Sequence, residues 1–84
     1  MNTRSVLIID DEASIRTTLS GALGDEGYRV SAAPDGPEGL ELFRRSKPDL
    51  ILLDIWMPGM DGIEVLKLIK AEDPGQVVIM MSGH

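Results

Sequence analysis

Three short runs of consecutive apolar residues constrain the fold of this chain more than any other feature. Each run is four or five residues long, and none alternates polar with apolar positions. Continuous aliphatic runs of this length are typical of strands that are covered on both faces, as in a parallel sheet. A fourth run, residues 28–32, alternates and indicates a strand nearer an edge. The three continuous runs are residues 6–9, 50–53 and 77–81.

Helical patterns separate these runs. Apolar residues at helical spacing predict helices near residues 15–23, 37–46 and 62–71. Asp61 stands where a side chain that caps the third helix is expected, and Pro48 is expected to end the second. Strands that alternate with helices indicate an α/β fold with parallel crossovers and helices on both faces of the sheet. In such sheets ligands bind beyond the carboxyl ends of the strands, where the strand order reverses.

The composition fits one small domain, which we place at residues 4–84. The chain has 84 residues, of which 43% are hydrophobic, and it has no cysteine. Its net charge of −6 argues against a basic nucleic-acid-binding face and against electrostatic attachment to an anionic membrane. The sequence shows no signal peptide and no apolar stretch long enough to span a membrane. Together with the lack of cysteine, this predicts a cytoplasmic location.

Acidic side chains directly follow two of the predicted buried strands. Asp10 and Asp11, with Glu12 behind them, follow the first apolar run, and Asp54 follows the run at 50–53. If these strands are neighbours, three carboxylates converge and repel one another, which favours a hard divalent cation such as Mg²⁺ or Ca²⁺. The simpler alternatives are that Asp11 caps the next helix and that Asp54 is a turn residue. Because both acidic positions fall at the same topological place, we favour a metal site.

Three other residues near strand ends allow two interpretations each. Ser82 follows the last apolar run and is either a turn residue or a hydroxyl that hydrogen-bonds a phosphoryl oxygen. His84, at the last position, is expected to be solvated rather than to be a ligand. Trp56 lies in the loop after Asp54 and serves either ordinary packing or a contact surface.

Three stretches of the chain resemble response-regulator receiver domains of two-component signalling. The family pattern has an acidic pair after the first strand, an aspartate with a following Met-Pro and Met-Asp-Gly, and Ser or Thr after the fourth strand. All three occur here in order, over nearly the whole chain. The ending Ser-Gly-His most resembles receivers of the σ54-activator, nitrogen-regulation type. The stretches are LIIDDE (7–12), DLILLDIWMPGMDG (49–62) and VIMMSGH (78–84).

The resemblance implies a flavodoxin-like, doubly wound parallel sheet with strand order 2-1-3-4-5. It implies that Asp54 is the phosphoacceptor and that Ser82 is the switch hydroxyl. The implied ligands of Mg²⁺ are Asp10, Asp11, Asp54 and the backbone carbonyl of Trp56. The phosphoryl donor would be a phosphohistidine on a sensor histidine kinase, or a small acyl phosphate. The switched surface would control an output domain, which we expect to be transcriptional.

Members of the family also have a fourth helix, a fifth strand that ends in a lysine, and a fifth helix. The 84 residues contain no counterpart of these elements. We therefore expect a piece of a longer regulator, with the output domain beyond residue 84. The strand at residues 77–81 would then be an uncharged apolar edge, which predicts a homodimer or other self-association.

Two further functions remain open. One is a receiver-like module that works through protein contacts without phosphorylation, which the absence of the family lysine favours. The other is a phosphoaspartate-forming phosphatase. Such enzymes resemble a pattern of Asp-x-Asp after the first strand, whereas Asp10 and Asp11 are adjacent here. On the leading interpretation the chain is a regulatory phosphoacceptor and not an enzyme that acts on a separate substrate.

Overall fold

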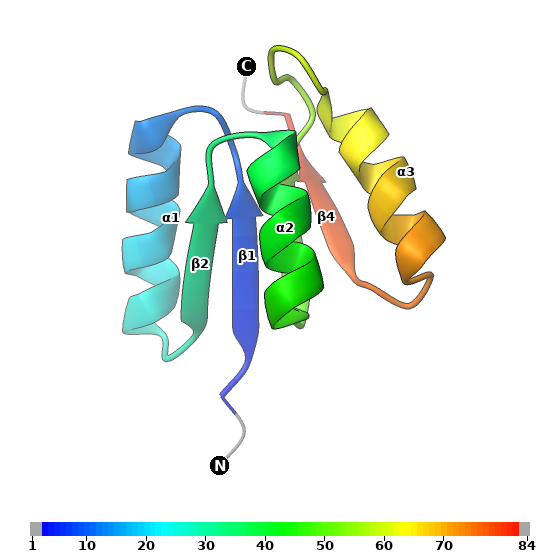
Figure 1. The fold of residues 1–84 in the computed structure, drawn as a ribbon. Helices are drawn as coiled ribbons and strands as arrows, with labels where there is room; N and C mark the ends of the chain where they lie inside the picture. Colours follow the sequence, from blue (N-terminus) through cyan, green and yellow to red (C-terminus); the bar gives the residue numbers. More distant parts are fainter. Residues whose placement is uncertain (1–2, 83–84) are drawn as a thin grey trace.

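The computed structural model describes residues 3–82 as strands and helices that alternate along the chain (Figure 1). Every predicted strand and helix is present within a few residues of its expected bounds, which confirms the α/β class. The elements are β1 (Ser5–Ile9), α1 (Ala13–Asp25), β2 (Arg29–Ala33), α2 (Gly36–Ser46), β3 (Leu50–Asp54), α3 (Gly62–Glu72) and β4 (Val78–Met81).

The strands form one parallel sheet in the order β2-β1-β3-β4. The chain runs outward from β1 to β2 on one side and from β3 to β4 on the other, so the strand order reverses between β1 and β3. The alternating strand lies at an edge, as predicted, but begins one residue later than expected. The reason is that the N–H of Tyr28 donates a hydrogen bond to the carbonyl of Leu23 (3.1 Å) at the end of α1.

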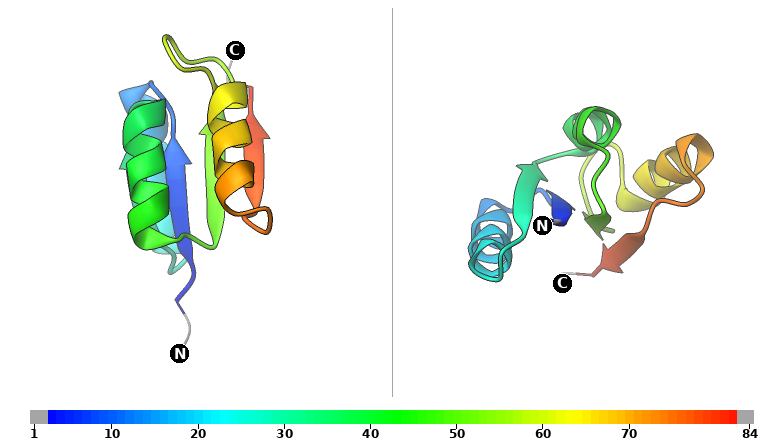
Figure 2. Two further views of the ribbon diagram at one scale, coloured as in Figure 1. Left: turned by 45° about the vertical axis from the view of Figure 1, so that its right-hand side comes forward. Right: turned by 90° about the horizontal axis from the view of Figure 1, so that it is seen from below.

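Helices cover both faces of the sheet, but unequally (Figure 2). α2 and α3 lie on one face, and α1 lies on the other over β1 and β2. No residue of α1 is fully buried, so its predicted apolar stripe is only partly covered. On the same face β4 is open, and Ile79 is 50% exposed. The core cluster, to which α2 and α3 contribute, consists of Leu7, Ile9, Leu40, Phe43, Ile51, Leu53, Met57, Val65 and Ile69.

Helix boundaries follow the local sequence. The carboxylate of Asp61 accepts a hydrogen bond from the backbone N–H of Glu64 (3.0 Å), which confirms the predicted cap of α3. α2 is followed by its C-cap residue Lys47, whose φ of 47° lies in the left-handed region. Pro48 follows directly, and the helix therefore stops where the sequence predicts.

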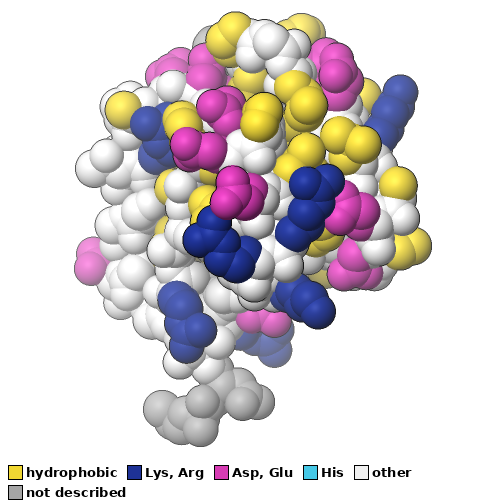
Figure 3. Space-filling model, viewed as in Figure 1, with side chains coloured by type: hydrophobic (Ala, Val, Ile, Leu, Met, Phe, Trp, Pro, Cys, Tyr) yellow, Lys and Arg dark blue, Asp and Glu magenta, His cyan; other side chains and the backbone are white. Residues whose placement is uncertain are grey.

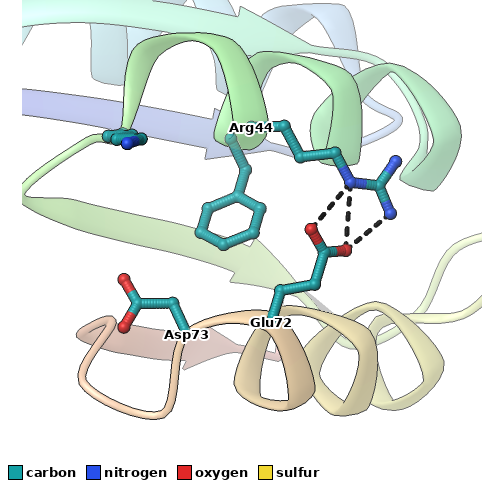
Figure 4. A pocket seen from close by; sticks show the side chains of 5 residues that line it. Arg44, Glu72 and Asp73 are labelled. Carbon is teal, nitrogen blue, oxygen red and sulfur yellow. Dashed lines mark hydrogen bonds and ion pairs between the residues drawn. The ribbon is translucent and has the colours of Figure 1, made fainter.

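An ion pair joins the last turns of α2 and α3 (Figure 4). The guanidinium of Arg44 donates to both carboxylate oxygens of Glu72, with the shortest distance 2.6 Å. Lys47 and Asp73 line the same surface cleft. Since α2 and α3 run antiparallel to the strands, this cleft lies at the amino ends of the strands, and the predicted aspartates lie at the other end.

The face that carries α2 has a mixed surface (Figure 3). Acidic and basic side chains are interspersed over it, and hydrophobic side chains gather towards the end where α2 and α3 begin. That end of the molecule is also where the carboxyl ends of the strands lie (Figure 1). Within residues 3–82, no helix has the length and apolar character needed to cross a membrane.

Candidate functional site

Asp10 and Asp54 lie side by side at the carboxyl ends of β1 and β3. Ile9 pairs with Leu53 in the parallel register, so Asp10 and Asp54 are the next residues to come opposite each other. Both are buried, with 4% and 2% of their surface exposed. The two carboxylates therefore meet at the point where the strand order reverses, which is the usual place of a ligand site in such sheets.

Asp11 completes a cluster of three carboxylates. One carboxylate oxygen each from Asp10, Asp11 and Asp54 lies within 4.8 Å of the other two. Asp11 is exposed, so the cluster is open to solvent on that side. Neither of the two ion pairs found within residues 3–82 includes any of these carboxylates. The cluster is thus a concentrated negative charge without an ion-pair partner among the described residues.

Backbone amides hold one oxygen of each buried carboxylate. Oδ1 of Asp10 accepts a hydrogen bond from the N–H of Glu12 (2.9 Å), and Oδ1 of Asp54 accepts one from the N–H of Trp56 (3.1 Å). Both are Asx turns. Asp10 and Asp54 are therefore turn residues, as the simpler alternative proposed for Asp54, and they also belong to the carboxylate cluster. Asp11 does not cap α1, because Glu12 occupies the N-cap position and its side chain makes no capping bond.

The electrostatic environment of Asp54 favours a bound cation. Burial raises the pKa of its carboxyl above the ordinary value of 3.8, and the negative charges of Asp10 and Asp11 raise it further. The hydrogen bond from Trp56 opposes this rise. A buried carboxylate crowded by like charges is stabilised by a positive ion. An all-oxygen donor set with few carboxylates fits Mg²⁺, which keeps waters and phosphate oxygens as its other ligands.

Gly62 allows the first turn of α3 to sit directly against the end of β3. A Cβ atom at this position would overlap the backbone carbonyl oxygen of Asp54 and come within 2.8 Å of Cα of Ile55. The N–H of Gly62 donates to the carbonyl of Ile55 (3.0 Å). Sequence inspection places Gly62 in a motif, but the need for a glycine follows only from this close approach.

Arg16 reaches from α1 to the same site. Its Nη1 atom donates a hydrogen bond of 2.7 Å to the backbone carbonyl of Asp10. No motif or spacing in the sequence indicates this contact, because it depends on the direction in which the side chain leaves the helix. Arg16 is therefore a residue near the site that sequence reasoning missed.

The remaining predicted residues lie around the cluster. Ser82 follows β4, whose end is tied to β3 by the N–H of Ile55 donating to the carbonyl of Met81 (2.9 Å). Ser82 is exposed, and Trp56 is 61% exposed, which favours a surface role over core packing for the tryptophan. His84 lies outside the described residues. The switch role of Ser82 and the metal contact of the Trp56 carbonyl stay predictions.

A partly apolar cavity of about 260 Å³ adjoins the carboxylates on the face that carries α1. Its apolar lining includes Ile15 and Leu19 of α1 and Met81 of β4, and its polar lining includes Asp10 and Asp54. The site thus combines a charged cluster with a hydrophobic wall, and both are accessible from the side of the sheet that α1 leaves partly open.

Comparison with known proteins identifies the family. The family model of the response regulator receiver domain matches residues 6–84. This chain belongs to that family. The crystal structure of the response regulator TrrA from Thermotoga maritima, in complex with Mg(2+)-BeF, matches with a TM-score of 0.93 at 35% identity. The match covers 98% of this receiver and 71% of that chain, and it confirms the flavodoxin-like fold.

Longer regulators are among the relatives of this receiver. Transcriptional regulatory protein AfsQ1 of Streptomyces coelicolor is 42% identical over 80 residues, which are 95% of this chain and 36% of that protein. Nitrogen assimilation regulatory protein NtrX of Azorhizobium caulinodans is 44% identical over 81 residues, 94% of this chain and 18% of that protein. The predicted likeness to a nitrogen regulator is therefore confirmed, and the receiver spans 36% or less of these two relatives.

Proposed function

We propose that this receiver is the phosphoacceptor module of a two-component response regulator and that Asp54 accepts the phosphoryl group. The observation that carries the proposal is the cluster of Asp10, Asp11 and Asp54 within 4.8 Å at the reversal point of the sheet. Oδ1 of Asp54 is held by the N–H of Trp56 (3.1 Å), which supports Oδ2 as the attacking atom.

In the proposed reaction, Oδ2 of Asp54 attacks the phosphorus of a phosphohistidine on a sensor histidine kinase. A P–O bond to Asp54 forms while the P–N bond breaks, and the imidazole keeps the electron pair. With a small acyl phosphate as donor, the bond that breaks is the P–O bond to the acyl group. Water later attacks the same phosphorus, which releases inorganic phosphate and restores the carboxylate. The chain therefore acts on itself as a regulatory element and has no separate substrate.

Asp10, Asp11 and Asp54, with the backbone carbonyl of Trp56, would hold Mg²⁺. When bound, the ion supplies positive charge that offsets the carboxylates and the phosphoryl oxygens. The chain itself supplies the orientation. The Asx turns fix the side chains of Asp10 and Asp54, and Gly62 fixes the backbone behind Asp54.

Phosphorylation would replace the single negative charge of the Asp54 carboxylate with a phosphoryl group that carries about −1.5 to −2, and that change in charge and size is the signal. We expect the hydroxyl of Ser82 to hydrogen-bond the new oxygens, because Ser82 follows the strand end that is bonded to Ile55. Exposed Trp56 would belong to the surface that changes. By analogy with AfsQ1, that surface would control a transcriptional output domain of a longer, cytoplasmic regulator.

Intact-mass spectrometry tests the proposal. The chain is incubated with Mg²⁺ and a small acyl phosphate, next to the variant Asp54→Asn and the control Asp25→Asn. Asp25 is an exposed aspartate at the far end of α1, so its replacement removes the same charge outside the cluster. We expect one added phosphoryl group on the parent chain and on the control, and none on Asp54→Asn.

A longer version of the receiver, which includes the family lysine, distinguishes the alternatives. Phosphoryl transfer to the longer chain alone would mean that the lysine is essential and that Asp54 is still the acceptor. Transfer to neither chain would favour the module that works only through protein contacts. Continuous release of phosphate from a phosphate ester would instead favour the phosphatase.

The predicted self-association has structural support at β4. This strand is an edge of the sheet, and within residues 76–82 no side chain is charged. Ile79 on the strand is 50% exposed, and Val77 directly before the strand is 54% exposed. An uncharged apolar edge pairs readily with another chain, so we propose a homodimer that forms through β4.

Light scattering at several concentrations measures the assembly directly. Ile79→Lys is expected to shift the chain to monomer, whereas Ile63→Lys on α3, where Ile63 is 43% exposed, is expected to leave the dimer intact. Because each chain carries a net charge of −6, the dimer should strengthen with salt. A monomeric parent chain at all concentrations would contradict this part of the proposal.

A further inference from the structure

We infer that Arg16 is a positioning residue for the carboxylate cluster and that it sets the geometry in which Asp10 and Asp11 receive a divalent cation. The inference rests on the proposed function, because the cation is the one that the phosphoacceptor site would hold. The contact that carries it is the hydrogen bond of 2.7 Å from Nη1 of Arg16 to the backbone carbonyl of Asp10.

Asp10 is held at three separate atoms. Its N–H donates to the carbonyl of Ala33 in β2 (3.1 Å), and its Oδ1 accepts from the N–H of Glu12 (2.9 Å). Its carbonyl accepts from Arg16. The first two bonds fix the strand end and the side chain, but only the third acts on the peptide unit that leads to Asp11. Loss of the Arg16 contact therefore frees the link between the two cluster residues.

Arg16 is placed to do this because α1 holds it firmly. Its own N–H donates to the carbonyl of Glu12 (3.1 Å) in the first bond of the helix, and its side chain is partly buried. The side chain therefore ties the first turn of α1 back to the end of β1 across the loop that carries Asp11. Among the described residues, the only other side-chain bond between this strand end and the start of α1 is the one from the Glu12 N–H to Oδ1 of Asp10.

The guanidinium engages a carbonyl and forms no ion pair with the cluster within residues 3–82. Because Arg16 binds a carbonyl, it occupies none of the carboxylate oxygens that a cation would use. Replacement of Arg16 should therefore change the Mg²⁺ affinity through two effects of opposite sign. Removal of a positive charge close to the cluster would, by electrostatics alone, strengthen Mg²⁺ binding. Movement of Asp10 and Asp11 away from their positions in the cluster would weaken Mg²⁺ binding.

A Mg²⁺ titration separates the two effects. Trp56 is the single tryptophan of the chain. Its backbone N–H donates a hydrogen bond to Asp54, so its fluorescence reports on the site. We expect Arg16→Gln to raise the Kd for Mg²⁺ about tenfold, as replacements of residues that orient metal ligands do. Arg16→Lys, which keeps the charge and the apolar stem, should raise it less. The control Arg45→Gln removes a charge from α2 and should leave the Kd unchanged.

Amide hydrogen exchange without metal gives a second readout. Arg16→Gln should speed exchange of the Glu12 amide, which bonds to Asp10. The Glu64 amide is the matched control, because it bonds in the same way to Asp61 (3.0 Å) and should be unaffected. A Kd at or below that of the parent chain, with unchanged exchange at Glu12, would overturn the inference. A parent chain that binds no Mg²⁺ would instead refute the proposed function, while faster exchange at Glu12 would still support the positioning role.

Discussion

Asp54→Asn is expected to stabilise the metal-free receiver, although Asp54 is the proposed phosphoacceptor. Asparagine keeps the shape of the side chain, and its Oδ1 can still accept the hydrogen bond from Trp56. The change removes one of three negative charges from a cluster whose oxygens lie within 4.8 Å of one another. Residues kept for function at a cost in stability are expected at such sites.

The size of the effect follows from the separation of the charges. Two unit charges 4.8 Å apart, at an effective dielectric constant of about 20, repel by about 3.5 kcal/mol. Asp10 and Asp54 are both buried and feel this repulsion, whereas exposed Asp11 is screened by solvent. Relaxation of the site reduces the gain, and we expect about 2 kcal/mol. For a domain of this size that is a rise in Tm of roughly 10 °C.

The gain in folding stability of Asp54→Asn over the parent chain should depend on pH. Burial and the neighbouring charges raise the pKa of Asp54 in the folded chain above its ordinary value of 3.8. The folded state therefore holds this proton more tightly than the unfolded state does. The resulting stability is fully present below the unfolded pKa and is lost as pH rises through the folded pKa. The parent chain and Asp54→Asn should accordingly be close in stability at low pH and should diverge as pH rises.

Thermal unfolding with a metal chelator, followed by circular dichroism, measures the difference. Asp25→Asn serves as the control, since it removes the same charge from an exposed position and should change the Tm only slightly. Saturating Mg²⁺ should raise the Tm of the parent chain and narrow its gap to Asp54→Asn. A Tm of Asp54→Asn equal to or below that of the parent chain in chelator would refute the electrostatic reasoning.

Three other replacements test the close packing beside the site, the cap of α3 and the core. Gly62→Ala should destabilise the fold by about 1–3 kcal/mol in a denaturant titration, because its Cβ would overlap the Asp54 carbonyl; it should also weaken Mg²⁺ binding, and equal affinity would count against this packing. Asp61→Ala should cost about 1 kcal/mol through loss of the α3 cap, measured in the same titration, with no change in Mg²⁺ affinity. Ile69→Ala, at a core position with 0% exposure, should cost about 2–5 kcal/mol and leave much of the chain unfolded by circular dichroism at ambient temperature.

The strands and helices were predictable because their signals are local. Continuous apolar runs mark β1 and β3, and alternation marks the edge strand β2. The cap at Asp61 follows from its own side chain and the first turn of α3. The convergence of Asp10 and Asp54 needed one further assumption, that β1 and β3 are neighbours, and the strand order supplies it.

The features that could not be predicted depend on side-chain direction and close packing between elements. The reach of Arg16 to the carbonyl of Asp10 requires a particular path of a long side chain from α1. The need for glycine at position 62 arises because the first turn of α3 lies against the backbone at the end of β3, and this close packing is not visible in the motif itself.

The role of Asp54 as phosphoacceptor is tested by locating the modified residue after reaction with an acyl phosphate and Mg²⁺. Borohydride converts an aspartyl phosphate to homoserine, and peptide mass spectrometry then identifies its position. We predict homoserine at residue 54 and at no other aspartate. Modification at Asp10 or Asp11, or no modification in a folded receiver of full family length that binds Mg²⁺, would contradict it.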